Sequence, residues 1–178
     1  MADPKLIHRE VAFRGRHVQV RLDRILDSKG NTTTLEIVEH PGAVCVVPVL
    51  ENGDVILVRQ YRHATGTRLL EICAGGLKPG ENPLDAARRE LEEETGYLAG
   101  KLVERARFWT TPGFTTEFMY LYEATDLVKT QTNPDEDEII DVEIAAQDEA
   151  LRMIDDGRIQ DAKSILGLLR VLPRRITR

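Results

Sequence analysis

Three glutamates in the middle of the chain have the residue type and the spacing to hold a divalent metal ion. They lie in the segment GGLKPGENPLDAARRELEEETGY, which covers residues 75–97. On a helix, where each residue advances by about 100°, Glu90, Glu93 and Glu94 fall within an arc of about 100°. Like charges at these spacings destabilise an isolated helix by about 0.2–0.5 kcal/mol per pair. The arrangement therefore favours a compensating cation.

A hard divalent ion such as Mg²⁺ meets this requirement, because it binds carboxylate oxygens and keeps waters and substrate phosphates as its other ligands. Gly75 and Gly76, which precede the helix, would let the backbone approach the same ion and its phosphates. A solvated acidic face is the usual interpretation of an arbitrary run of glutamates. Glu92 is set apart from the three glutamates, because it points in a different direction on the helix.

The surrounding residues favour the metal site, because the segment resembles the Nudix box, Gly-x5-Glu-x7-Arg-Glu-U-x-Glu-Glu-x-Gly-U, in which U is a bulky apolar residue. Every defined position is filled, and Tyr97 is the one soft match, being aromatic where an aliphatic residue is more usual. The matching residues are Gly75, Glu81, Arg89, Glu90, Leu91, Glu93, Glu94, Gly96 and Tyr97. The resemblance implies a metal-dependent hydrolase that cleaves a diphosphate bond.

The resemblance also implies a role for individual residues of this segment. Glu90 and Glu94 would be the principal metal ligands, and Glu93 with the carbonyl of Ala74 would complete the metal set. Arg89 would orient the glutamates and, with Glu93, belongs to the expected catalytic group. The expected cofactor is Mg²⁺, with Mn²⁺ as a substitute.

The flanks of the box are similar to the ADP-ribose pyrophosphatase branch of the family. The similar segments are EHPGAVCVVPVL, VRQYR, LLEICAGGLKPGE, PGFTTE around Pro112, and PDEDE. Cys73 departs from the branch, which more often has proline there. The resemblance implies hydrolysis of ADP-ribose to AMP and ribose 5-phosphate. Two alternatives stay open, namely a nucleoside diphosphate sugar hydrolase of the same family and a Nudix-fold sensor that binds such ligands without turnover.

The same resemblance implies roles for residues outside the helix that carries the three glutamates. Arg62 would contact the diphosphate, which a planar guanidinium suits better than a lysine does. Gly76 and Glu117 would also contact the substrate. Glu136 would be the general base, and Glu138 a further metal contact or the alternative base. The ordinary alternatives are a solvated strand-end charge for the arginine, a polar strand residue for Glu117 and a turn of solvated charges for the acidic loop.

The pattern of residues 1–40 predicts an N-terminal antiparallel β appendage. Residues 41–178 are expected to form the catalytic domain. Apolar and polar positions alternate in three segments, at 5–13, 16–26 and 32–40. The appendage resembles the segment through which the branch dimerises and lends residues to the partner's pocket, so the resemblance implies a homodimer. Phe13, Arg16 and His17 are the candidates for this contact, and their alternative role is in the packing and turn of the hairpin.

The rest of the chain predicts an α+β protein, in which a mixed central sheet is packed by few helices; the resemblance implies the Nudix-type α/β/α sandwich. Strands are expected at 42–50, 54–62, 68–74, 97–109, 117–125 and 139–144, and helices at 83–95, 147–156 and 160–172. The sequence Glu51-Asn52-Gly53-Asp54 predicts a type I′ turn between the first two of these strands.

Composition limits the classes of function. The chain has 178 residues, 42% of them hydrophobic, and a formal net charge of -6, which suits one globular domain and argues against general binding to nucleic acid or membrane surfaces. No apolar run approaches the roughly 20 residues that cross a bilayer, so we expect a cytoplasmic protein. The resemblance implies a small nucleoside diphosphate as its partner. Cys45 and Cys73 lack CxxC spacing and predict small buried side chains rather than a disulfide or a zinc site.

Overall fold

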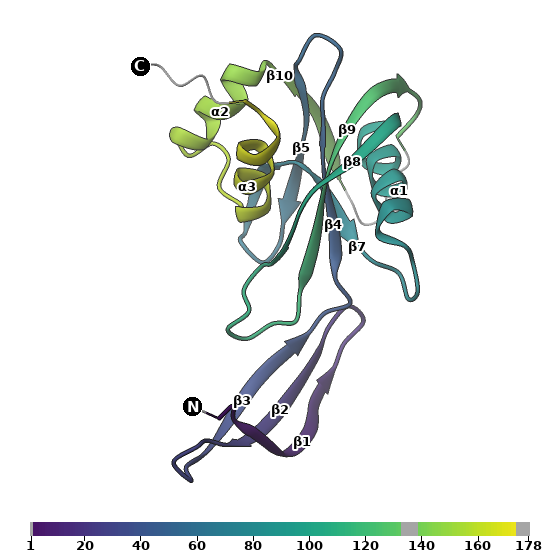
Figure 1. Cartoon of the computed structure of the whole chain (residues 1–178). Helices are drawn as coiled ribbons and strands as arrows, with labels where there is room; N and C mark the ends of the chain where they lie inside the picture. The colour runs from purple at the N-terminus through teal and green to yellow at the C-terminus, as the bar shows by residue number, and fades with distance from the viewer. Residues whose placement is uncertain (1, 133–138, 174–178) are drawn as a thin grey trace. The chain divides into compact units, whose positions relative to one another are not determined.

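The computed structural model of the chain describes residues 2–132 and 139–173. The chain forms two compact units, and Figure 1 labels most of their elements. Unit 1 comprises Met1–Gly42 and Trp109–Phe118, and unit 2 comprises Ala43–Phe108 and Met119–Arg178. In the described part of the chain, no helix is long and apolar enough to cross a membrane.

Unit 1 is built on an antiparallel sheet of three strands in the order β1-β2-β3. The strands are β1 (Lys5–Arg14), β2 (Gln19–Leu26) and β3 (Thr32–Glu39). The three predicted strands are therefore present, but the second begins at Gln19 instead of residue 16. The cause is a turn in which the Gly15 N–H donates to the Val18 carbonyl at 2.9 Å.

Unit 2 contains two sheets that share one core region. The antiparallel sheet has the order β10-β5-β6, with β10 (Ile140–Ala145), β5 (Val55–Arg62) and β6 (Thr67–Glu71). The second sheet has the order β7-β4-β9-β8 and is mixed, because β4 runs parallel to β9 and antiparallel to β7. Its strands are β7 (Cys73–Gly76), β4 (Ala43–Pro48), β9 (Phe118–Lys129) and β8 (Tyr97–Trp109).

The single strand predicted at 68–74 is in fact two strands that belong to different sheets. β6 ends at Glu71 and β7 begins at Cys73. Between them, the N–H of Ile72 donates to the hydroxyl of Ser164 at 2.8 Å instead of to a neighbouring strand. The prediction was wrong here because a continuous apolar run suits a buried strand in either sheet. Such a run does not indicate where the chain passes from one sheet to the other.

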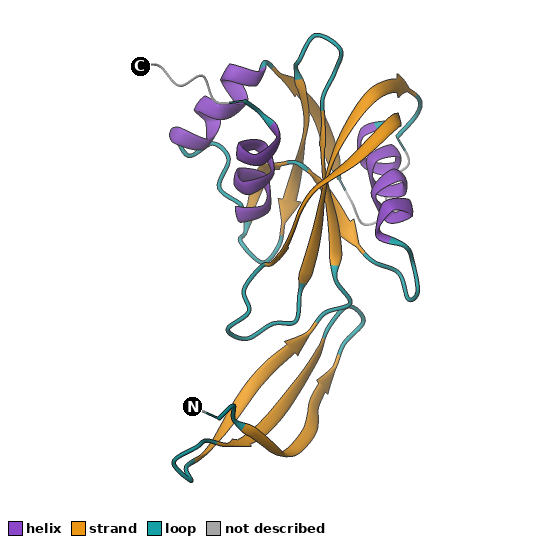
Figure 2. Cartoon of the chain, viewed as in Figure 1, coloured by secondary structure: helices purple, strands orange, loops and turns teal. Residues whose placement is uncertain are grey.

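The apolar strand β4 lies between two layers of helices. The helices are α1 (Pro83–Thr95), α2 (Gln147–Asp155) and α3 (Ala162–Val171). Successive side chains of a strand face opposite sides, so Val47 packs in one core cluster with Leu168 of α3, and Val46 packs in another with Leu91 of α1. Figure 2 shows α1 on one side of the sheets and α2 and α3 on the other. The predicted α/β/α sandwich is confirmed.

The turn between β4 and β5 is not the predicted type I′ turn. A type I′ turn needs positive φ at both central residues, but Asp126 is the one non-glycine residue with positive φ in the described part of the chain, so Asn52 does not qualify. Instead, the Gly53 N–H donates to the Leu50 carbonyl at 2.9 Å, and Gly53 has a φ of 88°. The loop therefore consists of a turn followed by a left-handed glycine. The residue types that favour this arrangement are similar to those of a type I′ turn, so the sequence did not distinguish the two.

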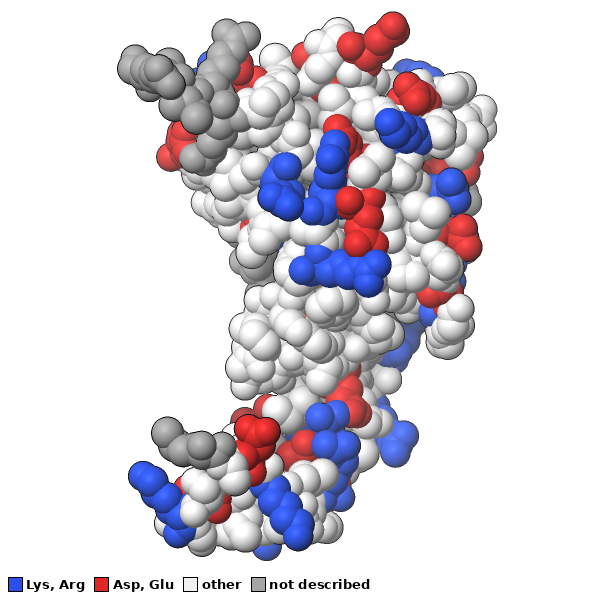
Figure 3. Space-filling model, viewed as in Figure 1, with Lys and Arg blue, Asp and Glu red and all other residues white. Residues whose placement is uncertain are grey.

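Acidic and basic side chains are interspersed over the face shown in Figure 3. Several of them are paired along β8 and β9. Arg105 donates to Glu123 through both Nε and Nη2, and Arg107 pairs with Glu104 at 2.7 Å. Exposed ion pairs contribute about 0–1 kcal/mol each, so these pairs shape the surface more than they stabilise the fold.

Candidate active site

The boundaries of α1 follow from its own sequence. The side-chain oxygen of Asn82 accepts a hydrogen bond from the Leu84 N–H at 2.8 Å, which satisfies one of the first free amides of the helix. Pro83 is the first helical residue, where its missing N–H costs no helical bond. Gly96 ends the helix with a φ of 70°, which glycine adopts at little cost. The helix predicted at 83–95 is confirmed.

The buried side of α1 decides the direction of its glutamates. Ala86, Ala87 and Leu91 lie in the core between the helix and the mixed sheet. Glu94 is only 2% exposed, and its carboxylate accepts the Ala74 N–H at 3.1 Å. A carboxylate at this depth requires hydrogen bonds or charge partners, so this bond ties α1 to β7, the strand that leads into the box.

Arg89 joins the glutamates of the helix to the loop that precedes it. Its Nη1 donates to Glu90 at 2.6 Å and to Glu93 at 2.9 Å. Its Nε and Nη2 donate to the two carboxylate oxygens of Glu81 at 2.9 and 3.0 Å. Hydrogen bonds from Arg89 lower the pKa of Glu81, and hydrogen bonding to Glu81 raises the pKa of Arg89. Glu81 was not among the predicted site residues, although its fixed place in the motif signalled a role.

Gly75 has no side chain, and this leaves room for the Glu90 carboxylate to lie against the backbone. A Cβ atom at position 75 would lie 2.0 Å from the carboxyl carbon of Glu90, so any other residue would displace that carboxylate. Gly76 follows on β7, and its carbonyl accepts from Nη2 of Arg89 at 3.4 Å. The structure thus brings Ala74 and Gly76 into contact with the box residues of α1, and their roles as metal and substrate contacts stay predictions.

The donor atoms of this site fit a partly hydrated divalent cation. In residues 2–132 and 139–173, no three histidine, cysteine, aspartate or glutamate side chains are already gathered as an ion cage. The Arg89 guanidinium donates to both Glu90 and Glu93 and so keeps these two carboxylates on the same side of the helix. Mg²⁺ is usually held by one or two carboxylates and keeps several waters. The glutamates beside Gly75 supply the carboxylates.

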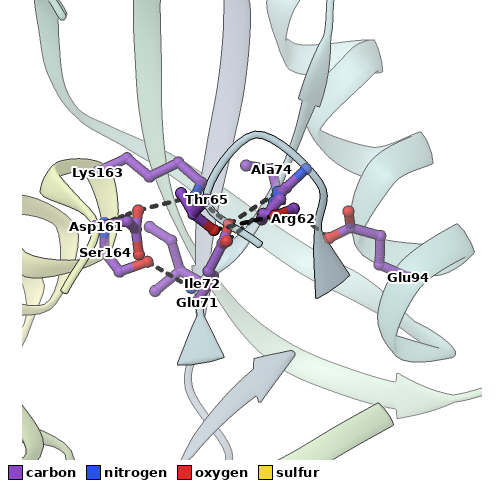
Figure 4. Close-up of polar contacts among 9 residues, drawn as sticks. All are labelled: Arg62, Thr65, Glu71, Ile72, Ala74, Glu94, Asp161, Lys163 and Ser164. Carbon is purple, nitrogen blue, oxygen red and sulfur yellow. Dashed lines mark hydrogen bonds and ion pairs between the residues drawn. The ribbon is translucent and has the colours of Figure 1, made fainter. Parts of the chain in front are cut away.

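Arg62 lies at the end of β5 and is paired with a carboxylate that the sequence analysis did not single out. Its Nε and Nη2 donate to the two oxygens of Glu71 at 2.9 and 2.8 Å (Figure 4). Lys163 of α3 also donates to Glu71. A signal was available, because a glutamate inside the apolar run LLEICA is rarely buried unless it is paired.

Glu117 and the three N-terminal candidates belong to unit 1. Glu117 accepts from the Thr110 hydroxyl at 2.7 Å, and its other oxygen lies 3.9 Å from Nδ1 of His40. Arg16 and His17 line a hollow of about 500 Å³, whose complete lining is Arg14, Gly15, Arg16, His17, Val18, Gln19, Glu39, His40 and Pro41.

Phe13 and the acidic loop complete the predicted set. Phe13 is 58% exposed at the end of β1 and contributes little to the interior of unit 1. Glu136 and Glu138 lie outside the described residues, so their expected roles stay predictions.

Cys73 and Cys45 are free and buried, as expected of small apolar side chains. Burial raises the pKa of Cys73 well above its usual range, and the neighbouring Glu94 adds to the shift. Burial likewise raises the pKa of Cys45 to about 12. Both thiols therefore stay neutral near pH 7, and the departure from the branch pattern at Cys73 puts no additional charge beside α1.

Comparisons with known proteins assign the family. Residues 39–167 match the model of the NUDIX domain, so the chain belongs to the Nudix family and is a hydrolase of that family. Such hydrolases use divalent metal ions, which agrees with the donor atoms of α1.

Two bacterial relatives and one solved structure cover nearly all of the chain. The chain is 39% identical over 168 residues to the methanol dehydrogenase activator of Bacillus methanolicus, covering 93% of this chain and 91% of that protein. It is 37% identical, with the same coverage, to the ADP-ribose pyrophosphatase of Bacillus subtilis (strain 168). A crystal structure of an ADP compounds hydrolase matches with a TM-score of 0.86 and 26% identity, covering 96% of this chain and 93% of the other.

Proposed function

We propose that the chain hydrolyses ADP-ribose to AMP and ribose 5-phosphate with Mg²⁺ as its cofactor. The observation that carries the proposal is the carboxylate face of α1. Arg89 donates hydrogen bonds to Glu90 and Glu93 of this face, and Gly75 leaves room for the Glu90 carboxylate beside the backbone. The choice of ADP-ribose is supported by the similarity to the B. subtilis pyrophosphatase over most of both chains. Because the metal helix is suited to any diphosphate, the substrate is decided by the residues around it.

The proposed metal ligands are Glu90 and Glu94, with Glu93 and the Ala74 carbonyl completing the set. When bound, Mg²⁺ neutralises charge on the phosphoryl oxygens and makes a coordinated water more acidic. Arg89 keeps two of these carboxylates oriented by hydrogen bonds at 2.6 and 2.9 Å. A ligand whose position is fixed in advance needs no rearrangement when substrate binds.

The remaining roles concern the substrate and the proton. Arg62 would bind the diphosphate through its planar fork, and Gly76 and Glu117 would also contact the substrate. Glu136 would accept a proton from the water that attacks one phosphorus, while the bridging oxygen leaves with the other phosphate; Glu138 is the alternative base. The products are AMP and ribose 5-phosphate.

A substrate panel with a metal-site variant tests the proposal. The panel contains ADP-ribose, nucleotide sugars and dinucleoside polyphosphates, each with Mg²⁺ and with Mn²⁺, and the products are identified. We expect AMP release from ADP-ribose to be the fastest reaction with Mg²⁺. Efficient cleavage of a nucleotide sugar without release of AMP from ADP-ribose would assign the other substrate class of the family.

Two conservative substitutions on one helix separate the metal role from helix stability. Glu94→Gln removes a proposed ligand and should lower kcat by at least about 100-fold, as losses of catalytic electrostatic groups do. Glu92→Gln changes the same residue type two positions away and should leave kcat unchanged, because Glu92 lies outside the carboxylate set. Full turnover by Glu94→Gln would refute the metal mechanism.

We also propose that unit 1 forms a homodimer through its three-stranded sheet. Every residue of β1 is exposed, including Leu6, Ile7 and Phe13, which are 43%, 46% and 58% exposed. Apolar side chains on a sheet with an open edge favour association with a second copy. Phe13, Arg16 and His17 would then contact the substrate of the partner. A single monomeric species at micromolar concentration by light scattering would contradict this proposal.

A further inference from the structure

A buried ion-pair network lies beside the strand that leads into the box, and the proposed reaction leaves its central residue without a role. Glu71 is the centre of the network, with a side chain only 1% exposed. Arg62 donates to its two oxygens at 2.9 and 2.8 Å, and Lys163 donates to the second of them. Lys163 is held in turn by Asp161 at 2.8 Å. Figure 4 shows these side chains meeting between β5, β6 and α3.

The charge of Glu71 is maintained against its burial. Burial by itself raises the pKa of Glu71, but hydrogen bonds and charges from Arg62 and Lys163 outweigh this effect and hold the pKa below its usual value. Buried ion pairs are often no more stabilising than apolar side chains of similar volume. Stability of the fold is therefore a weak reason to place an ionised glutamate at this position.

Arg62 is held at its backbone as well as at its side chain. Its carbonyl accepts from the N–H groups of Thr65 and Gly66 and from the Thr65 hydroxyl, each at 3.0 Å. The Arg62 side chain is nevertheless 36% exposed, so part of it reaches the surface while Nε and Nη2 are bound to Glu71. An arginine that is already ordered loses less conformational entropy when it binds an anion.

The segment that carries Glu71 also supports the metal helix. Next to it, the Ile72 N–H donates to Ser164 of α3 at 2.8 Å, and the Ala74 N–H donates to Glu94 of α1 at 3.1 Å. Residues 71–74 thus connect the proposed diphosphate arginine, the C-terminal helix and a proposed metal ligand (Figure 4). A displacement of Glu71 would therefore shift the Arg62 guanidinium and weaken its contact with the substrate.

We propose that Glu71 is a positioning residue, which holds the Arg62 guanidinium in place for the substrate diphosphate and is itself held by Lys163. This inference rests on the proposed role of Arg62 in binding the diphosphate. Glu71 would act through Arg62 and would touch neither the substrate nor the reacting atoms. An ion pair with a purely structural role would affect thermal unfolding and leave the Michaelis constant unchanged.

A double-mutant cycle on the full chain tests the proposal, with the panel substrate that is cleaved fastest and saturating Mg²⁺. Glu71→Gln should raise KM by about 3- to 10-fold, because Arg62 must then be ordered on binding, and should leave kcat within about twofold. Arg62→Met should raise KM by about 10- to 100-fold through the loss of charged hydrogen bonds. In the Arg62→Met background, Glu71→Gln should add less than about twofold, because the group that it positions is gone.

Glu123→Gln is the matched control, since Glu123 also accepts two bonds from one arginine, Arg105. It should leave KM unchanged. Equal increases of KM by Glu71→Gln in both backgrounds would overturn the proposal, and so would an unchanged KM with a lowered Tm. Should Glu71→Gln fail to fold, Lys163→Met retains the carboxylate and should raise KM about twofold or more, but only where Arg62 is present.

Failure of the proposed function gives a different result. Wild-type protein that cleaves another diphosphate but not ADP-ribose refutes the substrate and leaves the cycle to be measured on that diphosphate. Wild-type protein without turnover on the whole panel refutes the reaction. The cycle is then measured as the Kd of ADP-ribose by calorimetry, and an unchanged Kd in Arg62→Met or Glu71→Gln overturns the inference about Glu71.

Discussion

Replacing Gly75 with alanine should damage the metal site and spare the fold. A Cβ at position 75 would lie 2.0 Å from the carboxyl carbon of Glu90 and 2.0 and 2.3 Å from its two oxygens. The atoms that it meets are the end of a flexible side chain and not backbone. We therefore expect the Glu90 carboxylate to move away, while β7 keeps its pairing with β4.

The size of the effect follows from the bonds that Glu90 would lose. Its bond to Arg89 is 2.6 Å long and joins two charged groups, and such a bond contributes about 1.5–3 kcal/mol, or about 10- to 150-fold. Residues that orient metal ligands typically change metal affinity by about 10- to 100-fold. We expect kcat/KM at fixed Mg²⁺ to fall about 100-fold, and the Mg²⁺ concentration for half-maximal rate to rise about 10- to 100-fold.

Stability should change by no more than about 1 kcal/mol, or about 2–4 °C in Tm for a chain of this size. The assay is a Mg²⁺ titration of the initial rate, with thermal unfolding measured separately in the absence of metal. Gly113→Ala is the control, because a Cβ at position 113 meets nothing within 4 Å. A wild-type Mg²⁺ dependence in Gly75→Ala would refute the reasoning, and a Tm loss above about 8 °C would show that the backbone had moved instead.

Three further results are expected. Arg89→Lys should lower kcat by about 10- to 100-fold, because one ammonium cannot reproduce the fork that bridges Glu81 and the two glutamates of α1; a kcat within twofold of wild type would contradict this. The pKa of Glu71 lies below its usual 4.5, so its stabilisation is complete above about pH 4.5 and is lost as the pH falls through the folded-state pKa. Tm measured from pH 7 to pH 3 should therefore fall less steeply in Glu71→Gln than in wild type, and parallel curves would be evidence against it. Ser164→Ala should lower the free energy of unfolding by about 1–3 kcal/mol in denaturant titrations, since it leaves the buried N–H of Ile72 without its acceptor; no change would mean that water replaces the hydroxyl.

The sequence by itself determined the parts of this protein whose causes are local. The helix at 83–95 was predictable because Asn82, Pro83 and Gly96 satisfy or end it through neighbouring backbone groups. The family was predictable because its motif is a set of residue types at helical spacing, and that spacing alone places three glutamates on one side. The α+β class was predictable because strand-length segments, some alternating and some continuously apolar, are accompanied by few helical segments, and the resemblance implied the layered arrangement.

Only the tertiary structure decided the features that join distant residues. The break at Ile72 depends on Ser164, which lies 92 positions away, so no pattern within 68–74 records it. The Gly75 cradle depends on a helix that folds back onto β7, and the charge of Glu71 depends on Lys163 from α3, also 92 positions away. Residue types along a chain specify local hydrogen bonds, whereas the partners of a buried charge are specified by packing. The helix α1 with its three glutamates could therefore be predicted from the sequence, and the network that holds Arg62 could not.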